Sequence, residues 1–257
     1  LGLGIVAGSL LSSRPVLAVA AVFAAAVLAA AAAARHRWGV LLLNLVAPAV
    51  AIGLSVAQPR QALTLAVIIV LGSLWGWALA LLWPERPAPA TLPPLPFPDT
   101  VTALRYGGLL GIAAAIAAAS SLALSLPHPG WAAAAVLLVM RPDLTLTTAR
   151  SWGRALATVA GAGTAYAVLG WYPAPWLIAV IAGGYLVAAV GISNARRYAI
   201  PLPTAFLVLT LLLYHSASQA EIQSTFLLRI AQNLYGVTLA LLFGAVLWPW
   251  SLRRARQ

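Results

Sequence analysis

The side chains that could do chemistry in this chain gather mostly between residues 127 and 154. An apolar run from Trp131 to Met140 is followed there by Arg-Pro-Asp-Leu-Thr-Leu-Thr-Thr-Ala-Arg-Ser-Trp-Gly-Arg. Arg150 and Arg154 are four residues apart, so they share one face of a helix. Two guanidinium groups beside a helix N-terminus suit a carboxylate. The alternative is a loop whose arginines reach the membrane surface and fix orientation.

The candidate substrate-binding residues of this stretch are Arg141, Asp143, Thr148, Arg150 and Arg154. One of the threonines at 145, 147 and 148 is expected to cap the helix that follows. Asp143 is the only acid of the stretch, so it is the candidate proton carrier. It fits equally well as an ion-pair partner of Arg141 or Arg150, or as a helix cap.

A second candidate is the pair Arg229 and Asn233, which share a helix face near the outer end of the last apolar segment. Here too an alternative stays open. An arginine can extend toward the membrane surface, and an asparagine in a membrane helix often links two helices.

Enzymatic chemistry is not indicated. The acidic and imidazole side chains are scattered and show neither metal-ligand spacing nor a catalytic triad: Glu85, Asp99, Asp143, Glu221, His36, His128 and His215. The chain has no cysteine, which excludes disulfides and thiol nucleophiles. We expect no enzymatic activity, no metal and no cofactor, and no nucleotide-binding motif is present.

The composition is that of a membrane protein. Hydrophobic residues make up 63% of the 257 residues and charged residues only 7%, whereas soluble domains carry about 25% charged residues. Disordered chains are poor in apolar residues, so disorder is excluded as well. The net charge of +11 is interpreted as charge on the cytoplasmic side of a membrane, and no nucleic-acid partner is expected.

About ten apolar segments predict an all-α, polytopic membrane bundle: 1–11, 16–34, 38–57, 62–83, 104–126, 131–140, 152–170, 174–193, 199–216 and 226–248. Residues 131–140 would span about 15 Å, half of a hydrocarbon core, and Pro142 blocks simple continuation of that helix. Asn44 and Pro48 are expected to distort the segment 38–57. The proline-rich stretch 84–103 is predicted to be an extended linker.

The arginines predict the orientation of the chain. With the linker 84–103 in the cytoplasm, twelve of the fifteen arginines fall at cytoplasmic segment ends, as the positive-inside rule requires. The basic tail 251–257 is then cytoplasmic too. Trp171, Trp176 and Trp248 stand at segment ends, which is typical of the aromatic belt at a membrane interface.

An internal repeat pairs residues 1–83 with about 154–248. Trp83-Pro84 corresponds to Trp248-Pro249, and the basic residues at 35–37 correspond to those at 196–197. Similarity of composition alone is the alternative. The repeat predicts two parallel six-helix modules: 1–83, incomplete and holding helices 3–6, and 104–250. Nothing pairs with 99–153, so we expect the natural protein to begin about 55 residues before Leu1, the length of that unpaired stretch.

The residues from Gly130 to Gly161 resemble the signature of the fusaric acid resistance family of aromatic acid exporters. The pattern is a tryptophan-led short helix, a proline, a threonine before an arginine, a second arginine and a glycine-rich helix: Trp131, Pro142, Thr148, Arg150, Arg154 and Gly161. The resemblance implies a bacterial inner-membrane exporter built from six-helix modules. Many members carry a large cytoplasmic domain, whereas this chain has only the linker there, and the first module lacks its own signature.

Together these features predict export of small organic anions, most specifically aromatic carboxylic acids, driven by the proton gradient. A membrane scaffold or accessory subunit without transport is one alternative, and a passive organic-anion channel is another. The expected partners are the lipid bilayer and the anion, and association into a homo-oligomer is compatible with the sequence.

Overall fold

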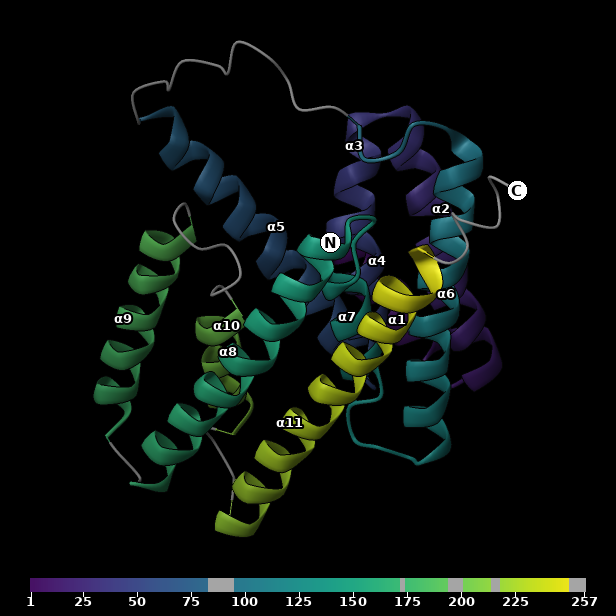
Figure 1. Ribbon diagram of the computed structural model, residues 1–257. Coiled ribbons are helices and arrows are strands. Elements are labelled where there is room, and N and C mark those ends of the chain that lie inside the picture. The colour runs from purple at the N-terminus through teal and green to yellow at the C-terminus, as the bar shows by residue number, and fades with distance from the viewer. Residues whose placement is uncertain (83–94, 172–173, 194–200, 214–217, 250–257) are drawn as a thin grey trace. The chain divides into compact units, whose positions relative to one another are not determined.

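The computed structural model describes residues 1–82, 95–171, 174–193, 201–213 and 218–249, and every regular element in them is a helix (Figure 1). The elements are α1 (Gly2–Leu11), α2 (Pro15–Arg35), α3 (Arg37–Leu41), the π-helical η1 (Leu42–Val46), α4 (Ala47–Gly53), α5 (Pro59–Leu81), α6 (Thr100–Ala123), α7 (Gly130–Val139), α8 (Leu144–Gly170), α9 (Pro175–Ser193), α10 (Pro201–Leu213), α11 (Gln219–Leu241) and the π-helical η3 (Leu242–Leu247). The all-α prediction is confirmed for these residues. The predicted tail 251–257, and the linker up to residue 94, lie outside them.

Each of the ten predicted segments corresponds to a helix or to a continuous run of helices. The segment predicted at 38–57 is α3, η1 and α4 in succession, and its π-helical turn contains Asn44, where the sequence predicts a distortion. Three helices begin four or more residues earlier than predicted: α6 at Thr100, α8 at Leu144 and α11 at Gln219. Apolar windows miss these first turns because they are polar. Each is capped by a side chain that accepts a backbone N–H bond: Asp99, Asp143 and Ser218.

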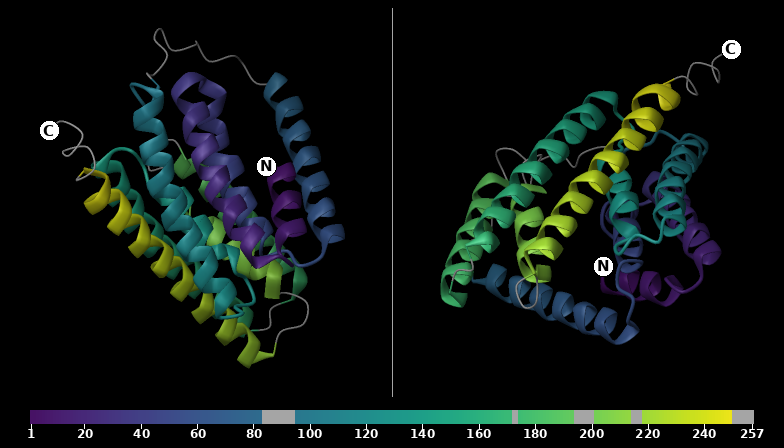
Figure 2. Two further views of the ribbon diagram at one scale, coloured as in Figure 1. Left: turned by 90° about the vertical axis from the view of Figure 1, so that its right-hand side faces the viewer. Right: turned by 90° about the horizontal axis from the view of Figure 1, so that it is seen from below.

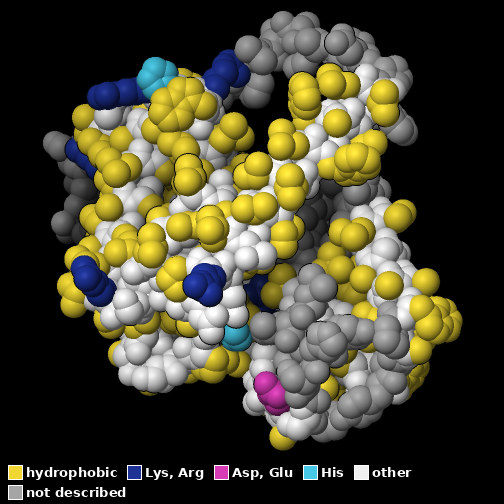
Figure 3. All heavy atoms as spheres, turned by 180° about the vertical axis from the view of Figure 1, so that it is seen from behind, with side chains coloured by type: hydrophobic (Ala, Val, Ile, Leu, Met, Phe, Trp, Pro, Cys, Tyr) yellow, Lys and Arg dark blue, Asp and Glu magenta, His cyan; other side chains and the backbone are white. Residues whose placement is uncertain are grey.

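The chain is a multi-pass membrane protein. Within the described ranges, four helices are long and apolar enough to cross a membrane: Pro15–Arg35, Pro59–Leu79, Thr100–Ala123 and Ala220–Leu247. Shorter apolar helices accompany them, among them Gly130–Val139. The face shown in Figure 3 is covered largely by hydrophobic side chains, and few arginines interrupt it. Such a surface is suited to contact with lipid.

The chain divides into two compact units. Unit 1 comprises residues 1–138 and 246–257, and unit 2 comprises residues 139–245. These units begin and end elsewhere than the predicted modules 1–83 and 104–250, whose equivalence stays a prediction.

Unit 1 is held together by small residues, and α2 packs along α6 (Figure 2). A methyl group added at Gly107 of α6 would lie 2.8 Å from Cβ of Ala30 in α2, so this glycine permits close approach of the two helices. Trp248 also belongs to unit 1. It is 3% exposed, and its ring lies 5.5 Å from that of Tyr106. The prediction that Trp248 belongs to an interfacial belt is therefore wrong, because this side chain packs inside the protein.

Unit 2 is built around α8, which packs against both α10 and α11. In α8 the buried positions recur at helical spacing, from Thr147 and Ser151 through Thr158 to Gly161 and Ala165. Ring contacts add to this packing: Tyr166 of α8 stacks on Phe226 of α11, with ring centroids 5.2 Å apart.

Gly161 sets the distance between α8 and α10, because a methyl group added there would overlap the carbonyl oxygen of Leu202. We expect Gly161→Ala to force the helices apart and to lower the free energy of unfolding by about 1–3 kcal/mol. Thermal unfolding in detergent measures this. Gly163→Ala is the matched control, because a methyl group at Gly163 meets nothing within 4 Å. Equal melting temperatures for the two variants would contradict the packing argument.

Candidate functional site

The helical conformation is interrupted between α7 and α8, where the sequence predicts that Pro142 ends a half-length helix. α7 ends at Val139 after ten residues, and α8 begins at Leu144. The Thr147 hydroxyl makes hydrogen bonds to both backbone groups of Arg141, which lies in this interruption. It donates to the carbonyl oxygen of Arg141 at 2.9 Å and accepts from the backbone N–H of Arg141 at 2.9 Å. Thr147 is fully buried, so this one side chain satisfies backbone groups at a place where no water reaches them.

Asp143 is the N-cap of α8. Its carboxylate accepts a hydrogen bond from the backbone N–H of Leu146 at 2.8 Å and another from the Thr145 hydroxyl. These bonds, first that from Thr145, lower the pKa of Asp143 below its usual value, because they favour the ionised form. Of the roles weighed from the sequence, the geometry favours the helix cap over the proton carrier. None of the three nearby threonines is the N-cap.

The other predicted residues of this stretch take different positions. Arg141 is buried and donates from Nη1 to the carbonyl oxygen of Met140 at 2.9 Å. The Thr148 hydroxyl donates to carbonyl oxygens of its own helix, those of Leu144 and Thr145, each at 3.0 Å. Arg150 is half-buried on α8, one helical turn before Arg154.

The two candidate sites of the sequence meet in one place. Nε of Arg154 in α8 donates to Oδ1 of Asn233 in α11 at 2.8 Å, across 79 residues of sequence. Arg229 precedes Asn233 by one helical turn, and its positive charge is close enough to repel that of Arg154. Arg154, Arg229 and Asn233 together are called the polar cluster below. Both arginines are partly buried.

No carboxylate lies against Arg154 in the described part of unit 2. The described acids of this unit, Asp143 and Glu221, are exposed in or before the first turns of α8 and α11. A partly buried guanidinium group beside a second positive charge is costly to keep without a compensating anion. The polar cluster is therefore electrostatically suited to an anionic ligand.

The polar cluster lies deep in its helix. Asn233 is near the middle of the candidate span Ala220–Leu247, about 20 Å from either end at 1.5 Å per residue. Because α11 begins at Gln219 and not at residue 226, both residues lie further from the start of the helix than predicted, and their position near the outer side of the membrane stays a prediction. An ionisable side chain within a membrane-spanning helix is by default a candidate functional site.

Sequence reasoning missed Gln232. This residue is 3% exposed, and neither Oε1 nor Nε2 has a hydrogen-bond partner among the residues that the structure describes. Nδ2 of Asn233 is likewise buried without a partner. Gln232 follows Arg229 by three residues, so helical spacing places it beside the polar cluster, and this spacing was the signal available in the sequence. The two amides and the two guanidinium groups together provide hydrogen-bond donors in one place.

A metal site is not formed in the described part of the chain, where no three histidine or acidic side chains come together. The two guanidinium groups of the polar cluster are cations, which repel a metal ion.

A family model described as "Fusaric acid resistance protein-like" matches residues 112–243, just over half of the chain. All seven candidate residues lie within the matched range. No curated protein and no solved structure matches the chain.

Proposed function

Because this chain belongs to the fusaric acid resistance protein-like family, we propose that it exports small organic anions, aromatic carboxylic acids among them, across the membrane that it spans. The polar cluster of unit 2 binds the anion. The proton gradient across a bacterial inner membrane drives the transport, with the linker and the C-terminal tail in the cytoplasm.

The observation that carries the proposal is the pairing of Arg154 with Asn233 beside Arg229. Arginine stays charged at every working pH, and its planar fork matches a carboxylate. The ligand would take donors from the guanidinium groups and from the buried amides of Gln232 and Asn233. Charge-assisted hydrogen bonds of this kind are about twice as strong as neutral ones.

The residues at the start of α8 have supporting roles in this proposal. Arg150 lies one turn nearer the beginning of α8 than Arg154, so it attracts the anion before the anion reaches the polar cluster. The interruption before α8 and the first turns of this helix are formed in part by Arg141, Asp143 and Thr148. Thr148 contributes least to binding, because its hydroxyl is already bonded to its own helix.

The arrangement of the helices is also part of the proposal. Two parallel six-helix modules, the first lacking its first two helices here, would be related by an axis along the membrane normal. The polar cluster belongs to the second module alone, since the first has Thr64 and Ile68 at the places of Arg229 and Asn233. One binding site per chain is expected.

Flux through proteoliposomes tests the function. Phthalate is a suitable probe, because this aromatic dicarboxylate stays charged near neutral pH and crosses pure lipid slowly. We expect the purified protein to move phthalate at a rate that rises with an imposed pH gradient while the membrane potential is clamped. A passive channel would give flux that does not depend on the pH gradient, and a scaffold would give no flux above protein-free vesicles. Either result would overturn the proposal.

A further inference from the structure

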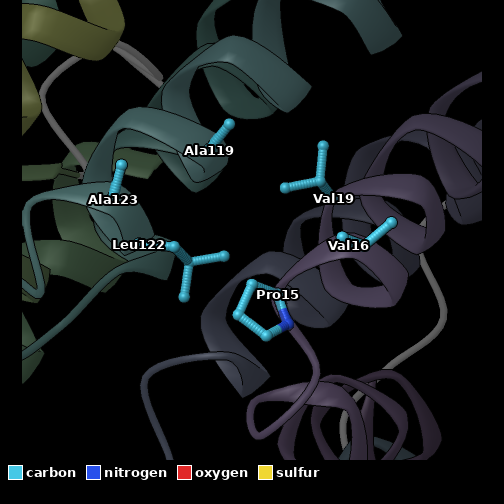
Figure 4. A pocket seen from close by; sticks show the side chains of 6 residues that line it. All are labelled: Pro15, Val16, Val19, Ala119, Leu122 and Ala123. Carbon is cyan, nitrogen blue, oxygen red and sulfur yellow. The ribbon is translucent and has the colours of Figure 1, made fainter.

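An apolar pocket lies between the beginning of α2 and the end of α6 in unit 1. Its volume is about 420 Å³, a size typical of small-ligand sites. Its lining residues are all apolar: Pro15, Val16, Val19, Ala119, Leu122 and Ala123. Figure 4 shows the side chains of the two helices facing each other across this space.

The pocket follows from the packing of the two helices. At Gly107 and Gly111 of α6 an added methyl group would lie 2.8 Å from side-chain atoms of α2, so there the helices approach closely. No glycine follows Gly111 in α6, and branched side chains such as Val19 and Leu122 line the end of the interface instead. The pocket is therefore built into the α2–α6 packing.

The position of the pocket favours a lipid acyl chain as its occupant. Both helices are candidate membrane spans, and the pocket lies where the α2 span begins and the α6 span ends. Val16, at its edge, is 81% exposed, so the pocket is open to its surroundings. Water needs polar partners that this lining does not offer, whereas an acyl chain from the bilayer fills the pocket with van der Waals contacts.

A positive charge stands next to the pocket. Arg14 directly precedes Pro15 and is exposed, and its guanidinium group makes no hydrogen bond or ion pair with another described residue. No side chain caps the N-terminus of α2, and Pro15 has no N–H, so the backbone N–H groups of Val16 and Leu17 are the ones available to an acceptor. Cation and N–H groups together suit the phosphate of a lipid headgroup.

We propose that this pocket binds one anionic phospholipid, with an acyl chain between α2 and α6 and the headgroup phosphate at Arg14. The site is separate from the polar cluster of unit 2, and it does not depend on the transport function.

Native mass spectrometry of the delipidated protein, titrated with phosphatidylglycerol or with phosphatidylcholine of identical chains, tests this site. We expect phosphatidylglycerol to bind first and about fivefold more tightly, the effect of one arginine on an anionic headgroup. Arg14→Gln should remove this preference. Arg60→Gln is the matched control, because Arg60 is also exposed and follows the proline that opens its helix, α5.

Filling the pocket is the second arm of the test. Val19→Trp should weaken binding of both lipids, whereas Val67→Trp, at an exposed position of α5, should not. If the Val19 variant does not fold, Ala119→Phe fills the pocket from α6. Unchanged binding in the filled variants, or equal losses in the Arg14 and Arg60 variants, would overturn the proposal.

Discussion

Arg154→Gln is expected to weaken the apparent affinity for phthalate by roughly 10- to 150-fold. A charge-assisted hydrogen bond contributes about 1.5–3 kcal/mol, and each 1.4 kcal/mol is about a tenfold change in affinity. The glutamine can still reach Asn233 with an amide, so the α8–α11 contact is preserved while the charge is lost. The measurement is the concentration dependence of phthalate flux into proteoliposomes.

Two further variants make this result specific to the guanidinium group at residue 154. Arg154→Lys should rescue poorly, because a point charge does not reproduce the planar fork. Arg105→Gln is the matched control, because Arg105 is exposed on α6 of unit 1, far in sequence from the polar cluster. Affinity losses of the same size at residues 105 and 154 would mean that net charge, and not a binding site, governs transport.

Thr147→Val is expected to have the largest effect on stability. The Thr147 hydroxyl bonds both the N–H and the carbonyl oxygen of Arg141, and valine keeps the shape but removes both bonds. A buried polar group that loses its partner costs about 1–3 kcal/mol, so the two groups together should lower the free energy of unfolding by about 2–6 kcal/mol. Denaturant unfolding in detergent micelles measures the loss.

The neighbouring threonine provides the control. Thr148→Val makes the same substitution one residue later, but the Thr148 hydroxyl bonds carbonyl oxygens within its own helix, so a small effect is expected. Thr147→Ser keeps the hydroxyl and should retain most of the stability. Similar losses in the free energy of unfolding at residues 147 and 148 would show that the Thr147 hydrogen bonds do not stabilise the interruption before α8.

The helices were largely predictable from the sequence, because apolar runs and prolines determine where membrane helices lie. The half-length helix before Pro142 and the distortion around Asn44 are both confirmed. The beginnings of α8 and α11 were not predicted, because their first turns are polar and depend on the caps Asp143 and Ser218. Hydropathy does not detect a capped polar turn.

The candidate site was predictable in its residues but not in its arrangement. The residue types of Arg154, Arg229 and Asn233 indicate anion binding, yet nothing local to either segment predicts that they meet. Their contact joins positions 79 residues apart and depends on how α8 packs against α11. In the proposed function Arg150, the expected partner of Arg154 on the same helix face, has a less direct role. The burial of Gln232 could not be predicted from the sequence.

Equilibrium binding of radiolabelled phthalate to the purified protein is the most direct test of the account. It separates recognition by the polar cluster from coupling and orientation in vesicles. We expect saturable binding to the unmodified protein and at least a tenfold weaker affinity in a monodisperse Arg154→Gln/Arg229→Gln double variant. Binding of equal affinity in the double variant, or no saturable binding to the unmodified protein, would contradict the claim that this cluster binds an organic anion.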